Sequence, residues 1–213
     1  MTQPSPITSA APSAHHYLRQ RILTGDLPGG QMLSEVQIAQ ELGISRTPVH
    51  EAFLRLESED LLTLSPKKGA IVAPMTPTEV ADVLEMRQML EVDSAAKIIA
   101  QGKAAALLPL LREILAVQAD HLAAGEKAAF AETDDRFHEA VILGTGNRLK
   151  ERMWRQISLR QQRLRYQFLI VKPEDLPGAY ADHLGLADAL EQGDAVAYAS
   201  LLAAHIERYR GAV

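Results

Sequence analysis

One aspartate and three histidines in the second half of the chain are residue types that bind metal ions. Asp134 and His138 are four residues apart, so on a helix both side chains leave the same face. His183 and His205 each lie on an apolar face of a later helical pattern, so both rings are expected to point inward. A carboxylate and three imidazoles from three helices would suit Zn, Ni, Mn or Fe, with coordination positions left open. A single inward histidine is more often a satisfied core residue than a ligand, so the residues alone leave a metal site and a buried histidine cluster as alternatives.

Arg87 is a second candidate for binding chemistry. It shares a helical stripe with Val80, Val83 and Leu90, which predicts that its guanidinium faces the interior of a helical domain. A buried and unpaired guanidinium is costly, so an anion is expected opposite it. That anion is either the carboxylate of a bound ligand or a protein carboxylate such as Glu91, and the residues leave both open.

Arg46, Thr47 and His50 form a third candidate group, on one face of a helix that is predicted to begin near Ser45. The opposite face has the i, i+3, i+4 and i+7 spacing of a core stripe, formed by Val49, Ala52, Phe53 and Leu56. An exposed helix N-terminus with Arg and Thr can enter the major groove of DNA, where Arg binds guanine and the hydroxyl binds phosphate. The alternatives are a helical domain with an arginine on its surface and a domain for protein contacts.

The elements before this helix are typical of a helix-turn-helix. A first helix is predicted to end at Gly25, and a second to begin at Ser34, where Gln37 completes a capping-box pattern. Gly43 suits the tight turn into the third helix, because glycine adopts positive φ without strain. The order of cap, turn and reader helix favours DNA binding over the alternatives.

A β-hairpin is predicted after the third helix. Residues 62–65 and 70–73 have strand character, and the loop between them carries Lys67 and Lys68 at its tip. Two cations at a hairpin tip would bind the DNA backbone or reach the minor groove. Three helices and a hairpin predict a winged helix-turn-helix domain over residues 13–75.

From Thr78 onward the sequence has helical periodicity and no strand pattern. Glycines and a proline separate six helical patterns with short connections, which predicts an antiparallel helical bundle over residues 76–213 and a mainly α protein. The predicted helices span residues 78–101, 103–124, 126–144, 147–171, 174–192 and 194–211.

The composition limits the class of protein. The absence of cysteine excludes disulfides and thiolate metal sites and fits a reducing cytosol, so a cytoplasmic location is expected. No apolar run approaches the roughly 18 residues of a membrane span, and residues 1–12 are expected to be a flexible tail. The formal net charge is −5, and residues 1–75 carry six Lys or Arg against seven Asp or Glu. Any affinity for DNA must therefore come from the local placement of a few cations.

The motifs of residues 30–72 are Leu33-Ser34-Glu35, Ile38-Ala39, Leu42-Gly43, Ser45-Arg46-Thr47-Pro48-Val49, Glu51-Ala52, Leu56 and Gly69. This stretch resembles the DNA-binding domain of the GntR family of bacterial transcription regulators. The resemblance implies that Ser45, Arg46, Thr47 and the His50 position contact operator DNA, and that the wing tip with Lys67, Lys68 and Gly69 reaches the minor groove. His50 stands where the family usually has Arg, and Asp60 where Gly is usual. A neutral histidine offers one donor in place of a guanidinium fork, which puts one DNA contact in question.

The second domain resembles the FCD effector-binding domain of the FadR-like GntR subgroup. The resemblance covers about residues 78–210 and is carried by Glu85-Met86-Arg87, Leu90-Glu91, Phe137, Asp134 with His138, Gly146-Asn147 and the two later histidines. It implies that Asp134, His138, His183 and His205 bind a divalent metal, often zinc, whose coordination the effector completes. It also implies that Arg87 and Asn147 bind an effector carboxylate.

These observations predict a bacterial transcription regulator that senses a small organic acid through a bound divalent metal. A homodimer is expected, because one reader helix makes too few contacts for a specific site and a two-fold protein matches a palindromic operator. The alternatives are a metal-dependent enzyme that uses the Asp/His cluster and a sensor of the metal itself.

Overall fold

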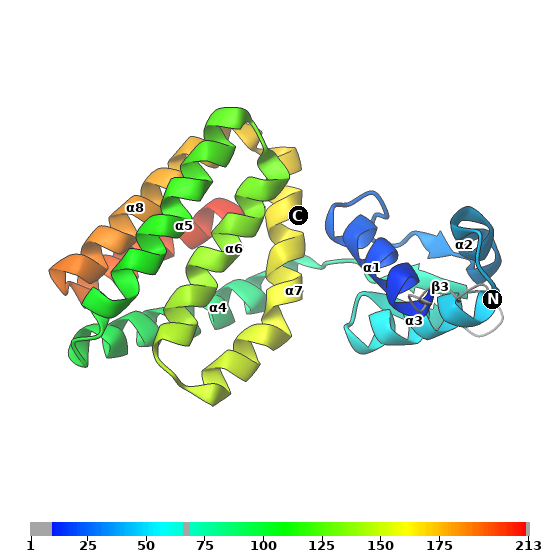
Figure 1. Ribbon diagram of the computed structural model, residues 1–213, viewed down its shortest axis with the longest axis horizontal. Coiled ribbons are helices and arrows are strands. Elements are labelled where there is room, and N and C mark those ends of the chain that lie inside the picture. The colour runs from blue at the N-terminus through cyan, green and yellow to red at the C-terminus, as the bar shows by residue number, and fades with distance from the viewer. Residues whose placement is uncertain (1–9, 66–68, 212–213) are drawn as a thin grey trace, which may run out of the picture. The chain divides into compact units, whose positions relative to one another are not determined.

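The computed structural model describes residues 10–65 and 69–211 of the chain. It divides into two compact units, Met1–Met75 and Thr76–Val213 (Figure 1). Most of the predicted tail and the predicted wing cations Lys67 and Lys68 lie outside the described residues.

The first unit is a winged helix-turn-helix, as the sequence predicts. Its elements are α1 (Ala10–Leu23), β1 (Met32–Leu33), α2 (Glu35–Leu42), α3 (Arg46–Ser58), β2 (Leu62–Ser65) and β3 (Gly69–Val72). The apolar stripe of α3 is fully buried, because Val49, Ala52, Phe53 and Leu56 pack into the core of the unit. Gly43 has φ 65°, the left-handed conformation expected of the turn between α2 and α3.

The hairpin is part of a three-stranded antiparallel sheet with the order β1-β3-β2. Strand β1 was not predicted, because two residues are too few for a periodic pattern. The capping box was also not formed: Ser34 is the extended N-cap of α2, but its side chain makes no capping hydrogen bond.

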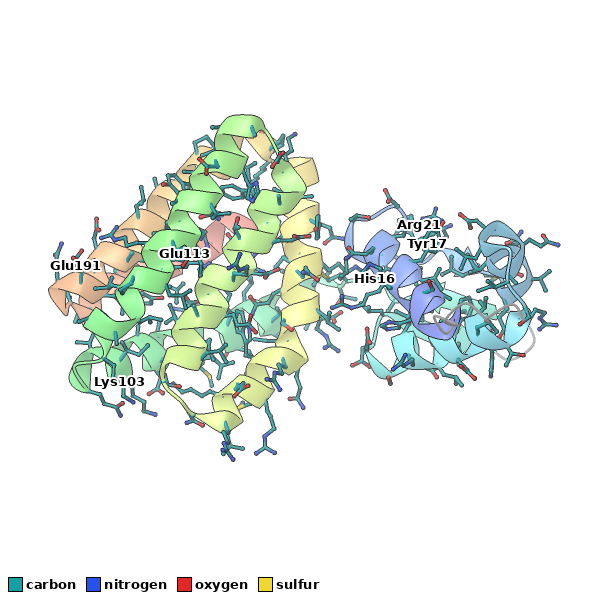
Figure 2. All side chains as sticks on the ribbon, in the orientation of Figure 1. His16, Tyr17, Arg21, Lys103, Glu113 and Glu191 are labelled. Atoms are coloured by element: carbon teal, nitrogen blue, oxygen red, sulfur yellow. The ribbon has the colours of Figure 1, made fainter. Side chains whose placement is uncertain are left out.

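A polar contact fastens α1 to α2. Tyr17 and Arg21 lie one turn apart on α1 (Figure 2). The Tyr17 hydroxyl and the Arg21 guanidinium both donate to Glu41 Oε1, at 2.5 and 2.8 Å. This contact joins the two helices in addition to the apolar core of the unit.

The second unit is all-helical. Its elements are α4 (Pro77–Ala100), α5 (Ala104–Ala124), α6 (Lys127–Gly144), α7 (Arg148–Val171), the 3-10 turn η1 (Pro173–Asp175), α8 (Leu176–Gln192), α9 (Ala195–Glu207) and the 3-10 turn η2 (Arg208–Gly211). Helices α5 and α6 run side by side, and α8 packs on α5 and α9 (Figure 1). Among the described residues, no helix is long and apolar enough to cross a membrane.

The interior of this bundle contains many polar side chains in addition to its apolar core. Arg87 and Glu91 on α4, Gln118 on α5 and Arg165 on α7 are all buried. Buried polar groups require hydrogen-bond or ionic partners, because leaving them unpaired costs free energy. Their partners define the site described below.

Candidate functional site

The N-terminal end of α3 exposes the predicted DNA-reading residues. Ser45 is the extended N-cap residue, and Arg46, Thr47 and His50 are exposed. Arg46 Nη2 donates to Glu35 Oε2 at 3.0 Å, and His50 Nδ1 lies 2.7 Å from Glu35 Oε1. The structure therefore brings Arg46 and His50 together through Glu35, which the sequence reasoning did not single out.

Gly69 opens strand β3 in a conformation that requires glycine. Its φ is 104°, and a Cβ at this position would collide with the backbone carbonyl of Leu33 in β1. Gly69 therefore sets the close approach of β1 and β3 and also follows directly after the predicted wing tip.

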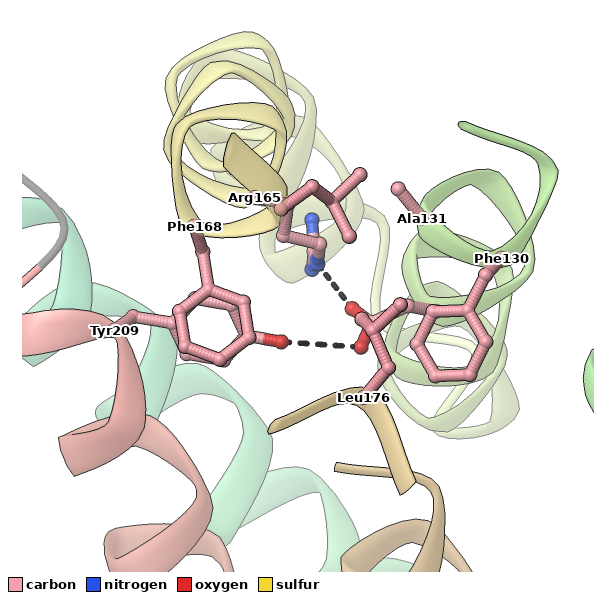
Figure 3. Close-up of a pocket in the computed structure, with 8 residues that line it drawn as sticks. Phe130, Ala131, Arg165, Phe168, Leu176 and Tyr209 are labelled. Carbon is pink, nitrogen blue, oxygen red and sulfur yellow. Dashed lines mark hydrogen bonds and ion pairs between the residues drawn. The ribbon is translucent and has the colours of Figure 1, made fainter. Parts of the chain in front are cut away.

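Asp134 is the centre of a buried polar site in the second unit. Its carboxylate pairs with the guanidinium of Arg165, which also pairs with Asp135. The Tyr209 hydroxyl donates to Asp134 Oδ1 at 3.2 Å, and Figure 3 shows Arg165 and Tyr209 converging on the carboxylate. Burial alone would raise the pKa of Asp134, but the charge of Arg165 holds it well below its usual range. The carboxylate is therefore ionised.

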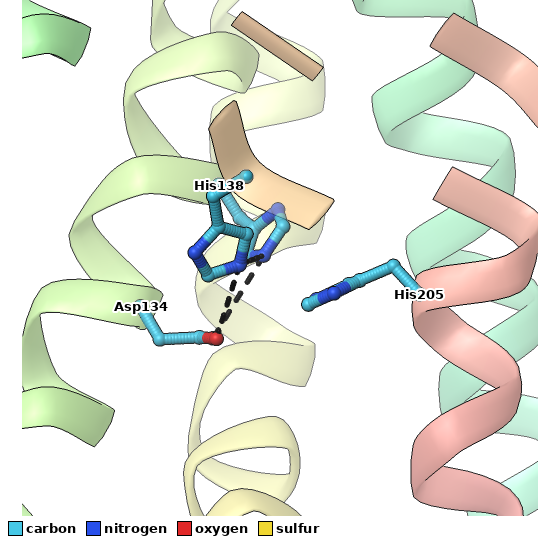
Figure 4. Close-up of side chains that lie close together, drawn as sticks. Asp134, His138 and His205 are labelled. Carbon is cyan, nitrogen blue, oxygen red and sulfur yellow. Dashed lines mark hydrogen bonds and ion pairs between the residues drawn. The ribbon is translucent and has the colours of Figure 1, made fainter. Parts of the chain in front are cut away.

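The three predicted histidines surround this carboxylate. Asp134, His138, His183 and His205 each offer one atom, and these four atoms lie within 4.8 Å of one another (Figure 4). His183 Nε2 is 3.2 Å from Asp134 Oδ1 and 3.2 Å from His138 Nε2. All four side chains are buried. The structure thus brings the four predicted residues into one cluster, with α6, α8 and α9 each contributing.

Each histidine has an acceptor at its outer ring nitrogen. His138 Nδ1 lies 2.7 Å from Glu91 Oε1, His183 Nδ1 lies 2.8 Å from Gln118 Oε1, and His205 Nδ1 lies 3.3 Å from Asp182 Oδ2. Acceptors at Nδ1 assign the ring hydrogen to that atom and leave Nε2 with a lone pair. The three lone pairs therefore converge on the centre of the cluster. Sequence reasoning missed Gln118 and Asp182, because they lie on neighbouring helices and no local spacing relates them to the histidines.

The electrostatic environment favours the neutral imidazoles of His138 and His205. Burial lowers the pKa of His138, and the charge of Arg87 adds to this effect. Burial also holds the pKa of His205 well below its usual range. A metal ligand must be an unprotonated imidazole, so both shifts favour coordination at neutral pH.

Arg87 lies at the edge of the cluster and is buried, as predicted. Its Nη2 donates to His138 Nε2 at 2.6 Å, and its Nε is 3.6 Å from Glu91 Oε2. Both Arg87 Nε and Glu91 Oε2 lack a hydrogen bond within the described chain. The guanidinium is therefore only partly satisfied.

Asn147, the other predicted effector residue, is the N-cap of α7. Its side-chain oxygen accepts from the backbone N–H of Leu149 and Lys150, at 3.0 and 3.3 Å. Asn147 is exposed, and none of its hydrogen bonds in the described structure reaches the Asp/His cluster.

A small cavity adjoins Asp134. It has a volume of about 10 Å³ and is lined by Phe130, Ala131, Asp134, Arg165, Phe168, Leu169, Leu176 and Tyr209 (Figure 3). A volume of this size holds roughly one water molecule. A larger apolar opening of about 320 Å³ between α5 and α6 contains none of the cluster residues.

A winged helix-turn-helix followed by a helical domain with a buried polar site is the arrangement of a DNA-binding regulator with a second, separate domain. Comparison with known families gives the same assignment. Residues 11–72 match the model of the bacterial regulatory proteins of the gntR family, and residues 82–208 match the FCD domain. The chain belongs to the GntR family of transcription regulators and carries an FCD domain.

Individual relatives are named as transcriptional regulators. An uncharacterised HTH-type regulator of Agrobacterium vitis is 34% identical over 132 residues, which cover 61% of this chain and 77% of that protein. Another from Streptomyces ambofaciens is 30% identical over 181 residues, with 83% and 73% covered. A solved GntR regulator from Rhodococcus has the same fold, with a TM-score of 0.77 at 22% identity over 95% of this chain and 96% of that one. The chain is therefore a DNA-binding transcription regulator and not an enzyme.

Proposed function

We propose that this regulator senses a small carboxylic acid through a divalent metal held by Asp134, His138, His183 and His205. Zinc is the first candidate, and nickel, manganese and iron suit the same ligands. The observation that carries the proposal is the convergence of one ring nitrogen from each of three histidines and one carboxylate oxygen within 4.8 Å in a buried site.

The chemistry of the donor set fits a cation. His138 Nε2 and His183 Nε2 are 3.2 Å apart, and their Nδ1 partners leave both atoms with lone pairs. Two lone pairs at this distance repel each other, and a positive ion between them would remove that repulsion. His205 Nε2 is buried without a hydrogen-bond partner among the described residues. Glu91, Gln118 and Asp182 would orient the three rings, as outer partners do in metal sites.

The contacts of Arg87 give a physical reason why binding of the metal and binding of the acid would be coupled. Its Nη2 uses the same His138 Nε2 lone pair that a metal would use. With that lone pair engaged, the buried guanidinium needs another anion, and a carboxylate ligand supplies one. A bound metal would contribute a positive charge that attracts the same carboxylate. Arg87 is therefore assigned to the acid and not to the metal.

Effector binding must rearrange the bundle. The cavity beside Asp134, at about 10 Å³, has no room for an organic acid. An acid that binds one arrangement of the helices better than the other shifts the population toward it, which is the requirement for allosteric control. Asn147 is retained as a proposed effector residue that would have to be recruited by this rearrangement.

The DNA side of the proposal assigns operator contacts to Ser45, Arg46, Thr47, His50, Lys67, Lys68 and Gly69. A homodimer places two such surfaces on a palindromic operator, since one reader helix makes few base contacts. The exposure of Arg46, Thr47 and His50 on one end of α3 supports this assignment.

Elemental analysis and thermal melts test the sensor. The wild-type protein should contain near-stoichiometric metal, and a panel of small carboxylic acids should raise the melting temperature only of metal-loaded protein. A preparation that never holds metal and that no acid stabilises would disprove the proposal. If DNA affinity follows metal concentration without any acid, the protein is instead a sensor of the metal itself.

A further inference from the structure

Glu35 connects the start of α2 to two predicted reading residues of α3. Its Oε2 accepts from Arg46 Nη2 at 3.0 Å, and its Oε1 lies 2.7 Å from His50 Nδ1. The Glu35 side chain is only 19% exposed, whereas those of Arg46 and His50 are 67% and 54% exposed. One anchored carboxylate therefore holds two side chains whose other ends remain open to solvent.

The geometry determines which atoms are left for another molecule. A carboxylate accepts hydrogen bonds but does not donate them, so His50 Nδ1 carries the hydrogen and Nε2 remains free. Arg46 uses one Nη2 contact and keeps its other donors. The hydrogen bond from His50 is the largest cause that lowers the pKa of Glu35, which keeps it ionised at neutral pH.

We propose that Glu35 is a positioning residue that sets the sequence specificity of DNA binding by fixing Arg46 and His50. The proposal rests on the assignment of these two residues to the DNA. Holding a long side chain in place before binding removes part of the entropy that it would lose at a base edge. The negative charge of Glu35 also opposes binding to phosphates of any sequence. Both effects favour the correct sequence over other DNA.

Histidine in place of arginine at position 50 changes what this side chain offers to DNA. With its Nδ1–H directed to Glu35, a neutral imidazole presents Nε2 as a hydrogen-bond acceptor, whereas a guanidinium only donates. The amino groups of adenine and cytosine in the major groove are donors, whereas phosphate is only an acceptor. A neutral His50 ring, whose Nε2 is an acceptor, is therefore suited to bind a base amino group and not a phosphate.

The test compares Glu35→Gln with Glu51→Gln in the full chain. Glu51 is an exposed acid on α3, so its change removes the same charge without touching the two contacts. The probes are the duplex that the wild-type protein selects from a random DNA library and a scrambled duplex of the same length. Glu35→Gln should lower the ratio of the two affinities by roughly tenfold, within the usual range for one base contact. Glu51→Gln should leave the ratio unchanged.

The possible outcomes separate a positioning role from the alternatives. A loss of specificity with no more than a small fall in melting temperature supports it, and so does a weaker effect of His50→Ala when Glu35 is already Gln. If Glu35→Gln raises the affinity for both duplexes equally, Glu35 acts only through its negative charge. That result would overturn the positioning role. A fall in melting temperature with an unchanged affinity ratio would make it a structural contact between α2 and α3. If the wild-type protein selects no DNA sequence at all, the proposed assignment of α3 to DNA is wrong, and the role of Glu35 fails with it.

Discussion

The chain has two polar clusters that differ in their access to water. In the first unit, Glu35, Arg46 and His50 meet at the surface, where two of the three side chains are more than half exposed. In the second unit, Asp134 and the histidines are buried. Exposed ion pairs contribute about 0–1 kcal/mol to stability, so the fold of the first unit depends little on this cluster. Removing one member of a buried pair typically costs about 3–5 kcal/mol, so that cluster needs every partner.

The difference in solvent exposure fits the different ligands proposed for the two clusters, which are DNA for the surface cluster and a metal with an acid for the buried one. The surface cluster presents Arg46 and His50 to solvent, so DNA can reach their remaining polar atoms without a change in the fold. In the buried cluster His205 Nε2 lacks a partner among the described residues, and a ligand would provide one. The following predictions test whether contacts in the buried cluster matter more for stability than contacts in the surface cluster.

The largest effect is expected for Asp134→Ala. In chelator-treated protein, the loss of this carboxylate should destabilise the second unit by about 3 kcal/mol, because Asp135 is then the one ionic partner that Arg165 keeps among the described residues. Denaturant unfolding followed by tryptophan fluorescence measures this unit alone, since the single tryptophan, Trp154, is buried in it. The control Asp188→Ala removes an exposed partner of Arg112 and should cost less than about 1 kcal/mol. Equal costs for the two variants would contradict the comparison.

The second prediction distinguishes residues that bind the metal from residues that bind the acid. His205→Ala should lose bound metal, whereas Arg87→Ala should keep the metal and lose stabilisation by carboxylic acids. A ligand at 100 times its dissociation constant stabilises the folded state by about 2.7 kcal/mol, which is measurable in a thermal melt. Metal content by elemental analysis and melts with acids check the two variants. Loss of metal from Arg87→Ala would move this residue from the acid site to the metal site.

A smaller effect is expected at the DNA. Arg46→Ala should relax one base preference by about 1–3 kcal/mol. Lys68→Ala should weaken binding to all sequences alike and reduce the slope of log affinity against log salt by about one. Binding isotherms on base-substituted duplexes at several salt concentrations measure both. The assignment of reader and wing fails if both variants change base preference equally.

The smallest effect concerns pH and the surface cluster. The pKa of Glu35 is lowered in the folded protein, so its ion pairs stabilise the first unit at pH values above the unfolded pKa of about 4.3. This stabilisation is lost as the pH falls through the folded pKa. Glu35→Gln should therefore reduce stability by about 0.2–1 kcal/mol at pH 7, and the difference should disappear in acid. Hydrogen exchange of amides in α2 and α3 measures the stability of this unit. A stability difference between wild type and Glu35→Gln that grows in acid would contradict the predicted pH dependence.

The sequence predicted the elements well and the contacts between them poorly. Helix ends in the second unit lie within about two residues of the predictions for α4 to α8, because glycines and prolines mark them. The inward direction of Arg87 and the histidines also followed from periodicity, and the structure confirms it. Gln118 and Asp182 were missed, since contacts between residues on different helices leave no local pattern. Glu35 was noted only as part of a family motif, because its contact with α3 depends on the turn at Gly43.

Strand β1 brings the sheet close to the contacts of the reader helix along the chain. It pairs with β3, which begins at Gly69, and it ends at Leu33, two residues before Glu35. Leu33 is the residue that Gly69 approaches closely, and Glu35 is the residue that contacts Arg46 and His50. Both contacts are therefore made by the three-residue segment 33–35.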